Sequence, residues 1–268
     1  PPDLIHAFLH EGAWVGYCLS RLWGVPLVFD YQGSLSAEMV DHGFLNEQSP
    51  MYRLVRRLER QINNLPDAVI TSSARALQVL KEDFDCRCRI MRTAPDGVDT
   101  ERFSRAGSRE GVKALFGQLN LPAEARIIAY LGKLAEYQGT GLLLEAAARL
   151  CRRHPDVHFL IMGYPHVREY AARAAALGIS HRVTFTGRVP YAEAPRYLSL
   201  ADIAVAPKLS ETESNGKLLN YMAMGIPTVA FDMPVAREYQ GDCGCYAPSR
   251  DNEGLAVAIE SALVSDTE

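Results

Sequence analysis

Short apolar runs alternate with amphipathic segments through the second half of the chain. The runs predict strands, and the longer segments carry apolar residues at helical spacing. Strands are predicted over residues 126–134 (opening into a loop), 157–163, 182–187, 201–207 and 227–232, and helices over 141–154, 168–178, 192–200 and 216–225. This alternation indicates a parallel sheet with right-handed crossovers, and the nearly continuous apolar strands indicate burial on both faces.

The first half shows the same alternation less regularly. Strands are predicted over residues 26–30 and 68–73, and helices over 50–65 and 74–84. The first of these helices has clear end signals, because Ser49 is a suitable N-cap, Pro50 suits the first helical position and Pro66 stops the helix.

A polar segment, residues 92–111, separates the two regions. It contains Pro, Asp and Gly turn signals without a sustained period, so we interpret it as the passage between two domains. The predicted domains are residues 1–106 and 107–268. We expect the first to be incomplete, since the chain starts without Met and directly enters an apolar run at Leu4–Leu9.

Composition and charge are those of an ordinary globular protein. Hydrophobic residues make up 48% of the 268 residues, charged residues 22%, and the formal net charge is −4. This balance provides no global positive field for nucleic acid. No apolar run approaches the ~20 residues that span a bilayer. The six cysteines lack zinc-site spacing, which favours reduced thiols over a metal site.

Three predicted strands end in loops of unusual polar content, residues 132–139, 187–193 and 207–217. Ligands of open parallel sheets bind beyond the carboxyl ends of the strands, so we expect these loops to face a cleft. The third loop leads into a helix start, where unpaired N–H groups favour an anion.

Charged and polar side chains in these loops suit a diphosphate. Gly216 permits close approach of a ligand and Lys217 adds a full charge, while Lys133 can neutralise and Gln138 can hydrogen-bond the same group. Taken singly, each residue is better explained as an ordinary surface or capping residue. P-loop and Gly-x-Gly-x-x-Gly spacings are missing, which removes the main support for other nucleotide-binding classes.

Four motifs, in this order and spacing, resemble the retaining glycosyltransferases of family 4 (group 1). They are APDGVDTERF, YLGKLAEYQGTGLLLEA, VTFTGRVPYAEAPRYLSLADIAVAP and NGKLLNYMAMGIPTVAF, which begin at Ala94, Tyr130, Val183 and Asn215. The resemblance covers nearly the whole chain. It implies the α/β fold called GT-B, in which two Rossmann-like domains bind a nucleotide-sugar, mostly through the second domain.

The resemblance also implies roles for individual residues, without a metal or a cofactor besides the donor substrate. The implied catalytic residues are Lys133, Glu213 and Lys217; the donor-binding residues are Gly132, Gln138, Gly139, Arg188, Ser214, Asn215, Gly216, Leu218 and Asn220; the acceptor-side residues are His10, Glu11 and Gln32. The implied mechanism is retaining transfer without a protein nucleophile, in which the leaving diphosphate helps to take the acceptor proton.

Three of these residues depart from the family pattern. Lys133 replaces Arg and loses its bidentate fork, Gln138 replaces Lys and loses the charge, and Asn220 replaces the acid that binds the ribose. The spacing between Glu213 and Asn220 is one residue shorter than usual. The diphosphate site would therefore depend more on Lys133, Lys217 and the helix end.

The resemblance leaves the substrates and two other function classes open. The loop at Thr186–Val189 matches a segment whose backbone contacts the nucleobase, so UDP, GDP and ADP donors all remain. The acceptor is expected to be a glycan or a lipid-linked molecule of bacterial surface polysaccharide synthesis. The alternatives are a GT-B nucleotide-sugar epimerase and a non-catalytic nucleotide-sugar-binding protein, which Gln32, Gln138 and Asn220 favour.

One predicted helix carries four arginines opposite an apolar stripe, Arg53, Arg56, Arg57 and Arg60. Such a face is either solvated, the more common case, or in contact with anionic lipid. We therefore expect a cytoplasmic protein that contacts the inner face of the membrane if its acceptor is lipid-linked.

Overall fold

The computed structural model describes residues 1–105 and 109–265, and the chain divides into two compact units. The first unit contains Pro1–Asp96 together with Ser210–Ser214, and the second contains Gly97–Leu209 together with Asn215–Glu268. The expected boundary between residues 106 and 107 falls outside the described residues. Both units alternate strands and helices, which confirms the predicted α/β class.

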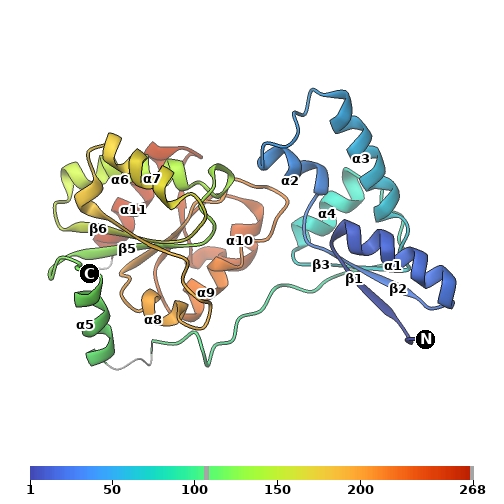
Figure 1. Cartoon of the computed structure of the whole chain (residues 1–268), viewed down its shortest axis with the longest axis horizontal. Helices are drawn as coiled ribbons and strands as arrows, with labels where there is room; N and C mark the ends of the chain where they lie inside the picture. Colours follow the sequence, from blue (N-terminus) through green and yellow to red (C-terminus); the bar gives the residue numbers. More distant parts are fainter. Residues whose placement is uncertain (106–108, 266–268) are drawn as a thin grey trace. The chain divides into compact units, whose positions relative to one another are not determined.

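The first unit is built on a parallel sheet of four strands in the order β1-β2-β3-β4 (Figure 1). Its elements are β1 (Ile5–Phe8), α1 (Leu9–Trp23), β2 (Leu27–Tyr31), α2 (Leu35–Asp41), α3 (Pro50–Asn63), β3 (Ala68–Thr71), α4 (Ala74–Glu82) and β4 (Ile90–Thr93). Helix α3 begins as predicted: Ser49 Oγ accepts a hydrogen bond from the Tyr52 amide, and Pro50 occupies the first turn.

The second unit is built on a parallel sheet of six strands in the order β10-β9-β8-β5-β6-β7. Its strands are β5 (Arg126–Leu131), β6 (Val157–Met162), β7 (Val183–Gly187), β8 (Ile203–Ala206), β9 (Thr228–Phe231) and β10 (Cys245–Ala247). Its α-helices are α5 (Arg109–Gln118), α6 (Thr140–Arg153), α7 (Val167–Ala176), α8 (Ala194–Leu198), α9 (Lys217–Ala223), α10 (Pro234–Gln240) and α11 (Asn252–Ser265), with short 3-10 helices η1 (Glu136–Gln138), η2 (Ser180–Arg182) and η3 (Gly241–Cys243). The strands and helices predicted for this half are all present.

Helices cover both faces of this second sheet, with α6, α7 and α11 on one face and α8, α9 and α10 on the other (Figure 1). Every residue of β6, β8 and β9 is buried, as their continuous apolar sequences predicted. A sheet that is covered in this way offers a ligand only the ends of its strands. Within the described residues, we find no helix that combines the length and apolarity needed to cross a membrane.

Candidate functional site

The topology of the second sheet places the candidate site between β5 and β8. The chain runs outward from β5 through β6 to β7, and then returns to form β8 on the other side of β5. Strand order reverses at this point, and open parallel sheets bind ligands in the crevice beyond such a reversal. All neighbouring strands are parallel, so the loops after β5, β7 and β8 leave the same edge of the sheet, as predicted.

Lys217 and Gln138, which lie 79 residues apart, meet at this edge. The Lys217 ammonium donates a hydrogen bond of 2.7 Å to Gln138 Oε1 and lies 3.3 Å from the Tyr130 hydroxyl. It also sits 4.5 Å from the centroid of the Tyr130 ring, within cation–π range. The structure therefore brings together two of the predicted diphosphate-binding residues and holds the ammonium in one place.

Two glycines allow the loops to approach this closely. Gly139 has φ +74°, and a Cβ there would overlap the carbonyl oxygen of Pro207 in the loop after β8. Gly132 has φ +155°, and a Cβ there would lie 2.8 Å from the Lys217 ammonium. Glycine at position 139 is therefore a condition for the close approach of the two loops, and at position 132 the positive φ favours glycine.

Two buried tyrosines, which sequence reasoning missed, support the turn after β5. Tyr130 donates a hydrogen bond of 2.7 Å to the carbonyl of Lys133, and Tyr221 accepts one of 2.8 Å from the amide of Leu131. Burial raises the pKa of both phenols, so they stay neutral at physiological pH. They act as fixed supports beneath the loop that carries Lys133.

A second support holds η1 from the side. Glu136 Oε1 accepts hydrogen bonds of 2.9 Å from the Tyr170 hydroxyl and 3.0 Å from the Arg173 guanidinium. Arg173 also donates to Glu145 on α6 at 2.6 Å. These contacts tie the loop of Lys133 and Gln138 to α6 and α7, and sequence separations of more than 25 residues kept them from being predicted.

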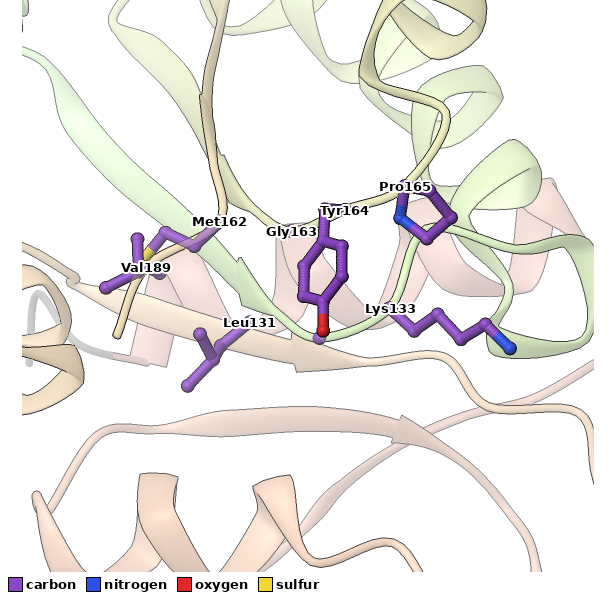
Figure 2. A pocket seen from close by; sticks show the side chains of 8 residues that line it. Leu131, Lys133, Met162, Gly163, Tyr164, Pro165 and Val189 are labelled. Atoms are coloured by element: carbon purple, nitrogen blue, oxygen red, sulfur yellow. The ribbon is translucent and has the colours of Figure 1, made fainter. Parts of the chain in front are cut away.

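A pocket of about 310 Å³ opens beside the same loop (Figure 2). Its lining combines apolar side chains, one aromatic ring and one cation: Leu131, Gly132, Lys133, Met162, Gly163, Tyr164, Pro165 and Val189. Figure 2 shows Leu131, Met162 and Val189 on one side of the Tyr164 ring and Lys133 on the other. The Arg188 guanidinium lies 5.1 Å from the centroid of that ring. Such a pocket suits a flat ring next to an anion.

The other predicted donor-binding residues lie around the start of α9. The helix predicted over residues 216–225 is present but shorter, since it has 7 residues and Gly216 is its N-cap residue. Asn220 is buried and accepts a hydrogen bond of 3.3 Å from Tyr191 in the loop after β7. Leu218 is packed in the core, and Asn215 is buried, its Oδ1 without a hydrogen-bond partner in the described part of the chain.

Residues 210–214 belong to the first unit, which therefore contains Glu213 and Ser214. Glu213 Oε1 lies 4.0 Å from His42 Nε2. The roles predicted for Glu213 and Ser214 at the donor stay predictions.

The predicted acceptor-side residues of the first unit lie in different surroundings. His10 is buried against Phe29 and Tyr31, and burial lowers its pKa to about 4, so its imidazole is neutral. Gln32 donates to Asp30 at 2.5 Å, and Glu11 is exposed in the first turn of α1. Their roles toward an acceptor stay predictions.

Sequence comparisons match both halves of the chain to known families. Residues 125–265 match the glycosyl transferases group 1, and residues 1–102 match Glycosyltransferase Family 4. A D-inositol 3-phosphate glycosyltransferase of Corynebacterium jeikeium is 28% identical over 276 residues, covering 98% of this chain and 64% of that relative. A 2-deoxystreptamine glucosyltransferase of Streptomyces kanamyceticus is 28% identical over 86% of this chain and 60% of its own length. The chain thus spans less than two thirds of these relatives.

Solved structures show the same fold. Anabaena Alr3699/HepE in complex with UDP and glucose superimposes with a TM-score of 0.82 at 21% identity, covering 99% of this chain and 70% of that chain. Sucrose-phosphate synthase from Thermosynechococcus elongatus superimposes with a TM-score of 0.81 at 23% identity, covering 99% of this chain and 65% of that chain. These similarities confirm the predicted fold class.

Proposed function

Because the chain belongs to the glycosyl transferases group 1, we propose that it transfers a sugar from a nucleotide-sugar donor to a glycan or lipid-linked acceptor. The observation that carries the proposal is the contact of Lys217 with Gln138 at the strand-order reversal, next to the pocket that contains Lys133. The HepE structure, which is similar in fold, contains UDP and glucose, and this supports a nucleotide-sugar as the donor.

Each part of the site has a role in this proposal. The apolar pocket beside Tyr164 takes the nucleobase, and the ammonium groups of Lys133 and Lys217 face the diphosphate. Negative charge grows on the diphosphate as the glycosidic bond to the donor sugar breaks, and fixed cations stabilise that charge without reorganising. The departing phosphate oxygen then accepts the acceptor proton, so that the protein needs no nucleophile of its own.

In this proposal Asn220 and Glu213 contact the sugar rings of the donor. Asn220 offers an amide to the ribose hydroxyls, and Glu213 accepts hydrogen bonds from the hydroxyls of the donor sugar. A metal and a further cofactor have no part in the proposal. Among the residues that the structure describes, no three His, Cys, Asp or Glu side chains gather as metal ligands.

Nucleotide binding is the first test. Thermal unfolding and calorimetry with UDP, GDP and ADP measure the donor site without knowledge of the acceptor. One of the three is expected to bind, and Lys217→Ala should weaken it by about tenfold or more, because hydrogen bonds to charged groups contribute ~1.5–3 kcal/mol. Lys113→Ala, an exposed lysine of α5, is the matched control. No binding of any nucleotide, or equal effects of the two substitutions, would remove this site from the proposal.

Product analysis separates transfer from the two alternatives. With labelled nucleotide-sugars, free nucleotide and a glycosylated acceptor support transfer, and an altered free nucleotide-sugar supports an epimerase. Binding without turnover supports a non-catalytic protein, which the neutral Gln138 and Asn220 favour. We further propose a role in bacterial surface polysaccharide synthesis, in the cytoplasm and at the membrane when the acceptor is lipid-linked.

A further inference from the structure

Helix α3 of the first unit presents two unlike stripes to solvent. Its buried side consists of Glu59, Ile62 and Asn63. At 3.6 residues per turn, the outer side splits into a cationic stripe and an apolar stripe. We call the two stripes together the α3 surface, whose residues are Arg53, Arg56, Arg57, Arg60 and Gln61 on one side and Met51, Leu54 and Leu58 on the other.

The cationic stripe forms a cavity of about 450 Å³ lined by its four arginines and Gln61. Two of the guanidinium groups are held from behind by neutral partners. Arg56 lies 4.7 Å from the centroid of the Phe84 ring, and Arg60 donates a hydrogen bond of 3.4 Å to the carbonyl of Asp83. The arginines are therefore positioned around a hollow rather than spread over the surface.

Within residues 1–105 and 109–265, none of these four arginines forms an ion pair. The nearby carboxylate of Asp85 is bound to Arg87 at 2.6 Å. Like charges three and four residues apart destabilise a helix, so an anion among these guanidinium groups would relieve their mutual repulsion. Arginine recognises phosphate oxygens with paired N–H donors, which makes a phosphate-bearing group the best fit.

The apolar stripe decides which phosphate-bearing molecule fits. Met51, Leu54 and Leu58 are 54%, 61% and 44% exposed, which is unusual for three large apolar residues on one helix face. A soluble phosphate or a nucleic acid would leave these side chains in water. A bilayer surface satisfies both stripes, because its headgroups meet the guanidinium groups while its acyl boundary takes the apolar side chains.

We propose that the α3 surface docks on an anionic lipid bilayer. The helix lies in the plane of the headgroups, with Arg53, Arg57 and Arg60 on lipid phosphates and Leu54 and Leu58 inserted toward the acyl chains. The α3 surface shares no residue with the proposed nucleotide site and acts whether or not sugar transfer is the reaction.

Vesicle binding of the full chain tests the proposal. Flotation compares vesicles of phosphatidylcholine alone with vesicles that contain about 30% phosphatidylglycerol, at about 0.05 M and about 0.5 M NaCl. The variants are Arg53→Gln/Arg57→Gln for the cationic stripe and Leu54→Ser/Leu58→Ser for the apolar stripe. Arg149→Gln/Arg152→Gln on α6 is the control with the same loss of charge. Circular dichroism checks that each variant folds.

The expected result is binding to the anionic vesicles alone, weakened by salt, about thirtyfold weaker in the arginine variant and unchanged in the control. The leucine variant should also bind the anionic vesicles at least tenfold more weakly than the wild type. Equal binding to both vesicles, no binding, or equal losses in the variants and the control would overturn the proposal. Arginine-dependent binding of glycerol phosphate without vesicle binding would overturn it in favour of a soluble ligand. Lys217→Ala should bind vesicles like the wild type, which separates failure of this surface from failure of the nucleotide site.

Discussion

Replacing Gln138 by lysine is the sharpest perturbation of the candidate site. Gln138 is buried, and its Oε1 lies 2.7 Å from the Lys217 ammonium, so Gln138→Lys places a second cation beside the first. At about 4 Å and an effective dielectric constant of about 20 the repulsion is ~4 kcal/mol, and it falls to ~2 kcal/mol if the new side chain turns away to about 8 Å. In a unit of this size 1 kcal/mol shifts Tm by ~2–4 °C, so the unliganded protein should lose about 4–16 °C.

A nucleoside diphosphate should reverse this effect, since two ammonium groups around one diphosphate attract it more strongly than one. Gln138→Lys is therefore expected to bind the nucleotide more tightly although it unfolds earlier. Gln138→Glu should do the opposite: its carboxylate pairs with Lys217, keeps or raises the unliganded Tm, and weakens nucleotide binding by about tenfold or more through repulsion of the phosphates.

Differential scanning fluorimetry without ligand measures the change in Tm, and calorimetry with the nucleotide measures the change in Kd. Each is measured at low and at high salt. Gln118→Lys and Gln118→Glu at the exposed end of α5 are matched controls for the change in charge. If the Gln138 variants shift Tm and Kd no more than the Gln118 variants, then Gln138 and Lys217 do not share one anion site.

Three further perturbations test other parts of the second unit. Gly139→Ala should lower the free energy of unfolding by about 2 kcal/mol or more, because the added methyl group overlaps the Pro207 carbonyl and the residue has positive φ. If the variant unfolds in urea at the same concentration as the wild type, this reasoning is wrong. Glu136→Gln should change the free energy of unfolding by less than about 1 kcal/mol, because exposed ion pairs contribute little. It should still weaken nucleotide binding several-fold, because the loop loses its ion pair with Arg173, and calorimetry with the nucleotide measures this loss. Burial lowers the pKa of His158 to about 4, so the unfolded state binds the proton more readily and stability should fall, on the order of 2 kcal/mol, as pH drops from about 6.5 to 4. His158→Gln should flatten that profile, and an unchanged profile would assign the loss to other groups.

Elements with strong local signals could be predicted from the sequence. The buried strands of the second unit are continuous apolar runs, and α3 has both a capping serine and a proline in its first turn. Helix α1 lacks such signals, because its N-cap residue is Phe8, which makes no side-chain cap, and its first residue has φ +62°. In α11 the apolar residues spread over more than one face, so no helical period marks it.

The candidate site was predictable where its geometry follows from topology. The contact of Lys217 with Gln138 follows from the topology, because both residues lie in segments that follow strands ending at the same edge of the sheet. The supports behind them could not be predicted, since the contact of Glu136 with Arg173 depends on how α7 packs against the loop. The sequence singled out Gln138 and Asn220 as departures from the family pattern, but their contacts with Lys217 and Tyr191 required the structure.

The loops after β5 and β8 are joined at two points, and this has a consequence for their motion. Gly139 lies against the Pro207 carbonyl, and the Leu209 amide donates a hydrogen bond of 2.9 Å to the Tyr137 carbonyl. Neither loop can open without breaking a contact of the other, so the two should behave as one cooperative unit in native-state hydrogen exchange. A ligand that touches only one loop would then slow amide exchange in both.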